Sequence, residues 1–188
     1  RAGDDAATRE AVEHLADRAH RDALGDREDE HQRGADGALE RVDQRQAERR
    51  DAEEAMVMCA YKQGHGPAAY DLGVTAKLFK NFAAALEYYQ AGTRFGSKES
   101  AAALMFIFDT EEWSLRDKQD QVALREIGIM PDTERKSRYD QISDALDLNP
   151  DLKLTRLDQV LPLPPAELPT WKGIQDVIEP DPEGPPSY

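Results

Sequence analysis

The sequence predicts an all-α protein, a short solenoid of paired helices followed by an extended proline-rich tail. Three observations predict this class. Apolar residues recur at intervals of three and four from about position 51. Helix caps divide that stretch into segments of ten to fourteen residues joined by short turns, which favours antiparallel neighbours packed pair on pair. Finally, eight of the eleven prolines fall within residues 162–186.

The expected helices follow one another closely along the chain. Their starts are marked in turn by Asp51, Pro67, Asn81, Ser97 and then Asp132 or Thr133. The third helix is predicted over 82–94, and the last one ends near residue 148 because Asn149 precedes a proline. A short helical segment over 152–160 is expected to follow. The predicted domains are therefore a charged segment over 1–50, a helical repeat domain over 51–148, and a short helix with the proline-rich tail over 149–188, packed on the repeats.

The first fifty residues differ in composition from the rest. Residues 1–55 hold ten of the sixteen arginines but no lysine, aromatic residue, proline, serine or isoleucine. So little apolar surface cannot offset the entropy of ordering the segment. Three interpretations remain open: two solvated helices over 6–24 and 35–60, a disordered charged arm, or an incorrect reading frame.

Composition limits the kinds of partner. The chain has 188 residues, with 24 Lys and Arg against 38 Asp and Glu, which gives a formal charge of −14. Such a surface repels phosphate and anionic lipid, so we expect neither nucleic acid nor a membrane surface as partner. No apolar run approaches the ~20 residues of a membrane helix, and we expect no stable membrane insertion of this chain. The oligomeric state stays open.

Internal similarity supports stacked helix pairs. Residues 68–72 align with 100–104 at an offset of 32, and residues 85–86 align with 123–124 at an offset of 38. The six extra residues are assigned to a loop over 109–118 that carries Trp113. Periods in the thirties are typical of helix–turn–helix solenoids. An irregular helical bundle with alanine-rich seams is the alternative.

Within these repeats the chain resembles the Sel-like repeats, relatives of the tetratricopeptide repeat. The resemblance rests on Leu72-Gly73 and on the run Ala-Leu-Glu-Tyr-Tyr-Gln-Ala-Gly over 85–92, and it covers about 51–128. The second repeat departs from the pattern, since Leu104-Met105 replaces Leu-Gly and the aromatic pair is missing. The resemblance implies a concave helical surface offered to another protein, without catalysis.

The tail carries a second resemblance. The run Leu-Pro-Leu-Pro-Pro-Ala-Glu-Leu-Pro-Thr-Trp-Lys-Gly over 161–173 must be extended, and we expect Trp171 and Leu168 to anchor it on the repeats. A proline-rich ligand for another domain is the rival interpretation. The run is similar to the tail of a bacterial family that follows Sel-like repeats with L-P-P-A-x-L-P-x-W-x-G. Members occur among the immunity proteins that neutralise type VI secretion effectors, notably phospholipases. This resemblance implies a bacterial protein whose partner is a cognate toxin, in the periplasm or alternatively the cytoplasm.

No catalytic constellation is recognisable. The four histidines, His14, His20, His31 and His65, lack the spacing of metal ligands, and glycine-rich phosphate loops are absent. Cys59 is the single cysteine and lies on an apolar helix face, which predicts a buried, inert thiol. We therefore expect no enzyme, no catalytic residue, no metal and no cofactor.

Binding residues are predicted from exposed aromatics in the groove of a stacked-helix fold. Tyr70 and Tyr88 are the candidates there, and Trp113 with Glu111 and Glu112 forms a mixed aromatic–acidic patch suited to a basic partner. In each case the alternative is an aromatic ring packed into the core. The sequence thus favours a non-catalytic immunity protein that binds and inhibits a phospholipase-type effector. A Sel-like scaffold for envelope or signalling complexes is the second hypothesis, and a structural fragment held in an oligomer by its charged N-terminal half is the third.

Overall fold

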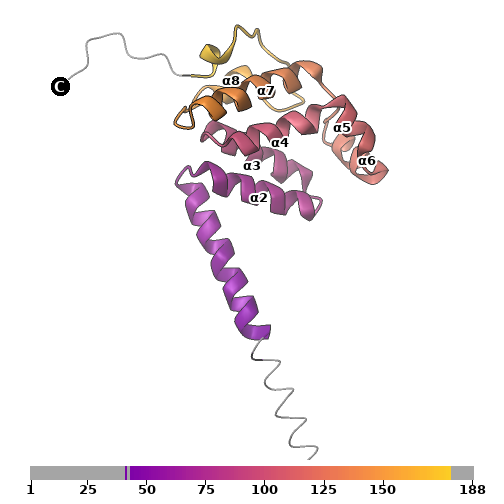
Figure 1. Cartoon of the computed structure of the whole chain (residues 1–188). Helices are drawn as coiled ribbons and strands as arrows, with labels where there is room; N and C mark the ends of the chain where they lie inside the picture. The colour runs from indigo at the N-terminus through magenta and orange to yellow at the C-terminus, as the bar shows by residue number, and fades with distance from the viewer. Residues whose placement is uncertain (1–40, 42, 179–188) are drawn as a thin grey trace, which may run out of the picture. The chain divides into compact units, whose positions relative to one another are not determined.

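A computed structural model of the chain describes residue 41 and residues 43–178, and these residues form helices and connecting segments without a β-strand (Figure 1). The prediction of an all-α fold is confirmed. The chain divides into two compact units, Arg1–Glu53 and Glu54–Tyr188. The described part of the first unit, residues 41 and 43–53, is helical and exposed. Asp51 lies inside this helical stretch, so the prediction that a helix begins there is wrong, and most of the 1–50 segment lies outside the described residues.

The second unit begins with helical residues 54–62 and continues through seven α-helices and one 3-10 turn. They are α2 (Gly66–Leu78), α3 (Phe82–Arg94), α4 (Lys98–Phe108), α5 (Thr110–Leu115), α6 (Lys118–Glu126), α7 (Thr133–Leu148), α8 (Leu157–Val160) and the turn η1 (Ile174–Asp176). The predicted bounds of α3 are confirmed. Only 157–160 of the segment expected over 152–160 is helical, because the main-chain N–H of Leu154 donates to the Arg94 carbonyl at the end of α3 (3.3 Å).

Side-chain caps explain why the helices begin where they do. The Asn81 amide oxygen accepts from the N–H of Ala84 (3.3 Å), and the Ser97 hydroxyl accepts from the N–H of Ser100 (3.1 Å). Asp132 caps α7 by accepting from two main-chain N–H groups, each at 3.0 Å. Partial burial raises the pKa of Asp132, but the hydrogen bonds and charge of Arg135 outweigh that effect, so its pKa lies below the ordinary value.

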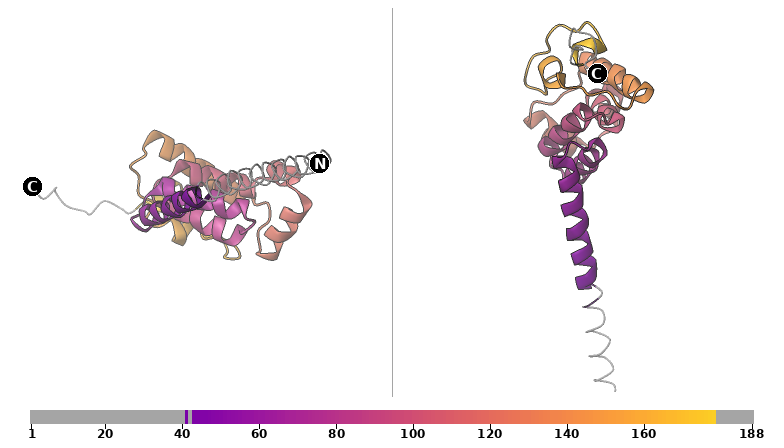
Figure 2. Two further views of the ribbon diagram at one scale, coloured as in Figure 1. Left: turned by 90° about the horizontal axis from the view of Figure 1, so that it is seen from below. Right: turned by 90° about the vertical axis from the view of Figure 1, so that its left-hand side faces the viewer.

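The helices stack in the order α2, α3, α4 and α7, with α5 and α6 at one end of α4 (Figures 1 and 2). The helix that contains residues 123–124 is predicted to pair with the preceding helix and complete the second repeat. This expectation is wrong, because the helix that packs on α4 is α7 and not α6. The rings of Phe108 and Tyr139 stack in parallel across this pair, with centroids 5.9 Å apart. By contrast, α6 buries only Leu124. The loop predicted over 109–118 contains the helix α5.

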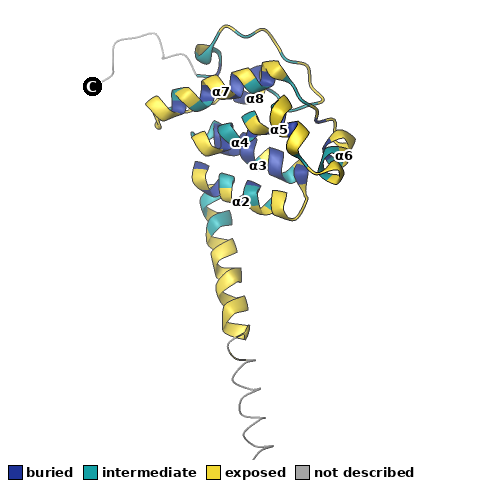
Figure 3. Ribbon diagram, turned by 45° about the vertical axis from the view of Figure 1, so that its right-hand side comes forward, coloured by how far each residue is buried: buried dark blue, intermediate teal, exposed yellow. Residues whose placement is uncertain are grey.

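Small residues let the helices approach closely. A Cβ at Gly92 of α3 would lie 2.2 Å from the Ser100 hydroxyl of α4 and 3.2 Å from the Ala69 methyl of α2. The buried side chains gather on the facing sides of the stacked helices, as the blue segments of Figure 3 show. They include fully buried leucines from α4, α6, α7, α8 and the segments flanking α8.

The segment after α8 is not helical up to η1, and hydrogen bonds join it to Gln90 of α3 and to Arg135 of α7. Two buried arginines of α7 hold it. Arg138 donates to the Val160 carbonyl (3.0 Å), and Arg135 donates to the carbonyls of Pro162 (3.3 Å) and Ala166. The proline-rich stretch has few main-chain donors of its own, so side chains of α7 satisfy its carbonyls.

Candidate partner-binding groove

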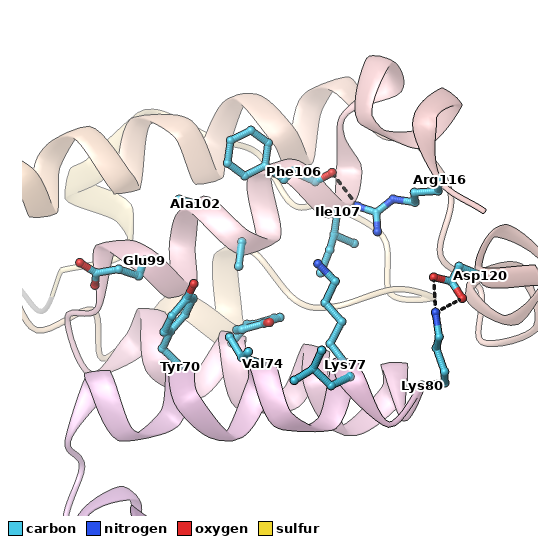
Figure 4. Close-up of a pocket in the computed structure, with 13 residues that line it drawn as sticks. Tyr70, Val74, Lys77, Lys80, Glu99, Ala102, Phe106, Ile107, Arg116 and Asp120 are labelled. Atoms are coloured by element: carbon cyan, nitrogen blue, oxygen red, sulfur yellow. Dashed lines mark hydrogen bonds and ion pairs between the residues drawn. The ribbon is translucent and has the colours of Figure 1, made fainter.

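Helices α2 and α4 form the walls of an open groove of about 720 Å³ (Figure 4). A second hollow of about 430 Å³ adjoins it and shares four lining residues. The lining residues of the groove are Tyr70, Val74, Lys77, Leu78, Lys80, Tyr89, Glu99, Ala102, Ala103, Phe106, Ile107, Arg116 and Asp120. The adjoining hollow adds Glu112 and Leu115.

Large apolar side chains are exposed along this groove. The exposed fractions are 74% for Leu78, 47% for Phe106 and 80% for Leu115. Leu78 ends α2 and Leu115 ends α5, so each projects from a helix terminus. Clustered exposed apolar residues beside a hollow are typical of a surface that binds another macromolecule.

Two tyrosines, Tyr70 of α2 and Tyr89 of α3, line the groove. The rings of Tyr70 and Tyr89 lie 5.9 Å apart, with an angle of 39° between their planes. Gly73 makes room for this arrangement, because a Cβ there would lie 2.4 Å from the Tyr89 ring. Burial and the neighbouring Tyr70 raise the pKa of Tyr89 to about 12, so its hydroxyl is neutral at ordinary pH.

Arg116 lies where the groove meets the adjoining hollow. It donates through Nη2 to the Phe106 carbonyl (3.0 Å), while its buried Nε has no hydrogen-bond partner among the described residues. Burial lowers the pKa of Arg116, and the charges of Glu112 and Asp120 act in the opposite direction. The guanidinium still remains charged, since the pKa of arginine starts far above neutrality.

The two lysines of the groove differ in their pairing. Lys80 donates to both carboxylate oxygens of Asp120, at 2.7 and 2.8 Å. The side chain of Lys77 projects from α2 between the walls (Figure 4), and its ammonium makes no hydrogen bond or ion pair with any described residue. This end of the groove therefore carries unpaired positive charge within an acidic chain.

Two of the predicted binding residues line these hollows, but not the same one. Tyr70 lines the groove and Glu112 lines the adjoining hollow. Glu111 is exposed on α5 but lines neither. Tyr88 lies elsewhere, half-buried against the edge of the Tyr61 ring, with centroids 5.2 Å apart. Trp113 is only 7% exposed, so the alternative in which its ring packs into the core is the arrangement observed.

The two predicted tail anchors, Trp171 and Leu168, are half-buried and pack against the core. The Trp171 Nε1–H donates to the Gln141 amide oxygen (3.2 Å), and the Arg138 guanidinium lies 5.4 Å from the centre of the indole ring. Their energetic role stays a prediction.

Sequence reasoning missed Lys77, Phe106, Leu115 and Arg116 of the groove and its adjoining hollow. Phe106 carried a usable signal, because it stands outside the buried stripe of α4 that contains Leu104 and Ile107. The pairing of charges is a tertiary property that the sequence pattern does not contain.

The residues considered for catalysis have other places. His65 caps α2 by accepting from the Ala68 N–H through Nδ1 (3.3 Å). Cys59 is exposed, so the expectation of a buried thiol is wrong. Over residues 43–178 there is no group of three or more His, Cys, Asp or Glu able to hold a metal ion. Within that same stretch, none of the helices has the length and apolar character needed to span a bilayer.

Fold and groove define an α-helical repeat protein with an open, partly apolar surface, and comparison with known proteins adds a relationship. Residues 100–185, from α4 to the tail, match the family described as Domain of unknown function (DUF6396). No curated protein sequence matches the chain.

Two solved structures are similar to it. One is the crystal structure of immunity protein Pa5087 from Pseudomonas aeruginosa, with 29% identity and a TM-score of 0.52, covering 63% of this chain and 42% of that one. The other is the Pseudomonas aeruginosa protein 5086 (PA5086), with 32% identity and a TM-score of 0.51, covering 66% of this chain and 43% of that one. The chain thus spans less than half the length of either.

Proposed function

We propose that this chain is a non-catalytic immunity protein that binds a toxin protein through the groove between α2 and α4. The open groove with exposed Leu78, Phe106 and Leu115 carries the proposal, because these side chains gain most from burial against a partner. The similarity to the immunity protein Pa5087 supports the same role. In this proposal the repeat domain predicted over 51–148 supplies the groove.

The finer identity of the partner follows from the resemblance of the tail. We propose a type VI secretion effector of the phospholipase type, and Sel-like ancestry for the repeats. Because such an effector attacks membranes from the periplasmic side, we propose that the immunity protein acts in the periplasm.

The test is co-purification of the tagged chain with the product of the neighbouring gene, followed by a lipase assay of the pair. We expect a stoichiometric complex in which lipase activity is lost. Separate elution with unchanged lipase activity would sink the proposal and favour a scaffold that binds several partners more weakly.

Three leucines at helix ends provide a matched set of variants for locating the interface. Leu78→Lys and Leu115→Lys alter the groove and its adjoining hollow, whereas Leu148→Lys alters the end of α7, where Leu148 is 88% exposed. All three place a cation at a helix C-terminus, which suits the helix dipole. We expect the first two to weaken the complex about tenfold or more and the control to change affinity by less than about twofold. Equal effects in all three would place the interface elsewhere.

A further inference from the structure

The charged end of the groove has a composition opposite to that of the whole chain. Three cations, Lys77, Lys80 and Arg116, face two carboxylates, Asp120 and Glu112, at the place where the groove meets the adjoining hollow. The chain as a whole carries a formal charge of −14. We propose that this end of the groove binds an acidic side chain that the partner presents between apolar residues.

The local charges leave one positive charge in excess, because three cations stand against two carboxylates, and the two carboxylates both act on Arg116. Asp120 is satisfied by Lys80, which donates to both of its oxygens. The Lys77 ammonium has three donors and no partner among the described residues, and Arg116 donates only through Nη2 to a described residue, to the Phe106 carbonyl. A carboxylate between Lys77 and Arg116 would gain charge-assisted hydrogen bonds from both.

Glu99 is a further carboxylate that lines the groove, and it does not compete for the position between Lys77 and Arg116. Glu99 lines the groove, and its Oε2 accepts a hydrogen bond from the Ser97 hydroxyl (3.2 Å). Glu112 is exposed in the adjoining hollow and belongs to the charges that act on Arg116. An incoming carboxylate thus meets positive charge only near Lys77 and Arg116, which fixes where along the groove it would bind.

Apolar walls on both sides determine the neighbours of that carboxylate. Val74 and Leu78 line the α2 side, Phe106 lines the α4 side, and Leu115 lies in the adjoining hollow. A volume of about 720 Å³ has room for several side chains. Burial of apolar neighbours would exclude water and strengthen the charge interaction.

This inference rests on the proposed function, in that the toxin supplies the segment that enters the groove. It deepens that function by naming the chemistry of the segment. The sequence predicts that Glu111 and Glu112 face a basic surface of the partner. The inference differs from that prediction, because the groove binds an acidic residue of the partner.

The experiment measures binding of short fluorescein-labelled peptides to the full chain by fluorescence anisotropy. The peptides share flanking leucine and phenylalanine residues and differ at the centre, which is Glu, Gln or Lys. We expect the Glu peptide to bind about tenfold more tightly than the Gln peptide and the Lys peptide to bind most weakly. Equal binding of all three peptides, or binding of none, would overturn the inference.

Charge reversal locates the site. Lys77→Glu should abolish the preference for the Glu peptide and restore binding of the Lys peptide. Lys62→Glu is the matched control, because Lys62 is also exposed near a helix C-terminus but does not line the groove. We expect this control to keep the wild-type preference, and an equal loss in both variants would contradict the assignment to Lys77.

The toxin complex separates this inference from the proposed function. A stable complex whose affinity is unchanged by Lys77→Glu overturns the inference and leaves the immunity role intact. Selective binding of the Glu peptide without any toxin complex retains the chemistry of the groove and overturns the immunity role.

Discussion

Gly92 lies where α2, α3 and α4 approach one another, and it has little room for a larger side chain. A methyl group there would collide with the Ser100 side chain, whose Oγ would be 2.2 Å away. We expect Gly92→Ala to lower the free energy of unfolding by about 1–2 kcal/mol, because overpacking costs more than the helix gains from alanine. Urea unfolding followed by circular dichroism measures the change.

A double-mutant cycle with Ser100 provides the control. The Ser100 hydroxyl is buried and has no hydrogen-bond partner among the described residues, so Ser100→Ala removes an unsatisfied polar group and should not lower stability. Combined with Gly92→Ala it removes the closest contact, and the double variant should be less destabilised than the sum of the single variants. Strict additivity, or a stabilising Gly92→Ala, would contradict this account of the glycine.

At the residue scale the sequence predicts local features well. The caps Asn81, Ser97 and Asp132 were recognisable because a cap needs only a side chain and the next main-chain N–H groups. The place of an aromatic ring was less predictable. Trp113 entered the core and Tyr70 the groove, and these outcomes depend on which helices become neighbours.

At the scale of elements, α7 and the tail stabilise each other. The guanidinium groups of Arg135 and Arg138 are buried, and Arg135 donates to the tail carbonyls of Pro162 and Ala166, while Arg138 donates to the carbonyl of Val160 at the end of α8. Each also pairs with a carboxylate of the first turn of α7 or its cap, with Asp132 at 2.7 Å and Glu134 at 2.9 Å. Loss of the tail would leave these contacts incomplete, so the proline-rich segment is part of the folded unit.

Trp171→Ala tests this coupling. The indole ring is half-buried and lies against Arg138, and we expect its removal to lower the free energy of unfolding by about 2 kcal/mol. Leu148→Ala serves as the control, since Leu148 is 88% exposed, and should cost less than about 0.5 kcal/mol. Chemical denaturation of both variants decides the matter. A change at Trp171 as small as that of the control would remove its role as an anchor.

The pairing of α4 with its partner helix differs from the sequence prediction. The short alignment of residues 85–86 with 123–124 favoured α6 as the partner of α4, but two aligned residues carry little information about packing. The pairing instead follows buried area, because α7 buries Tyr139, Ile142 and Leu146, and α6 buries only Leu124. Counting apolar positions at helical spacing over 133–148 would have indicated the same result.

At the scale of the whole chain, the total charge and the charge of the groove attract opposite groups of a partner. The formal charge of −14 favours approach of a basic protein over long distances. The groove, with Lys77 unpaired among the described residues and Arg116 beside it, instead attracts a carboxylate at close range. A partner that satisfies both has a basic surface from which one acidic residue projects among apolar ones.

This division predicts a particular dependence on salt for the complex with the toxin. Long-range attraction is screened at high ionic strength, whereas contacts inside a water-excluding groove are screened much less. Raising NaCl from about 50 mM to about 500 mM should therefore lower the association rate about tenfold and change the dissociation rate by less than about threefold. Stopped-flow mixing gives the association rate, and surface plasmon resonance gives the dissociation rate.

Lys77→Glu should show the opposite pattern, with faster dissociation and an association rate close to that of the wild type. The variant removes one close contact while changing the total charge by only two. An association rate independent of salt would contradict the role assigned to the overall charge, and a dissociation rate unaffected by Lys77→Glu would contradict the role assigned to the groove.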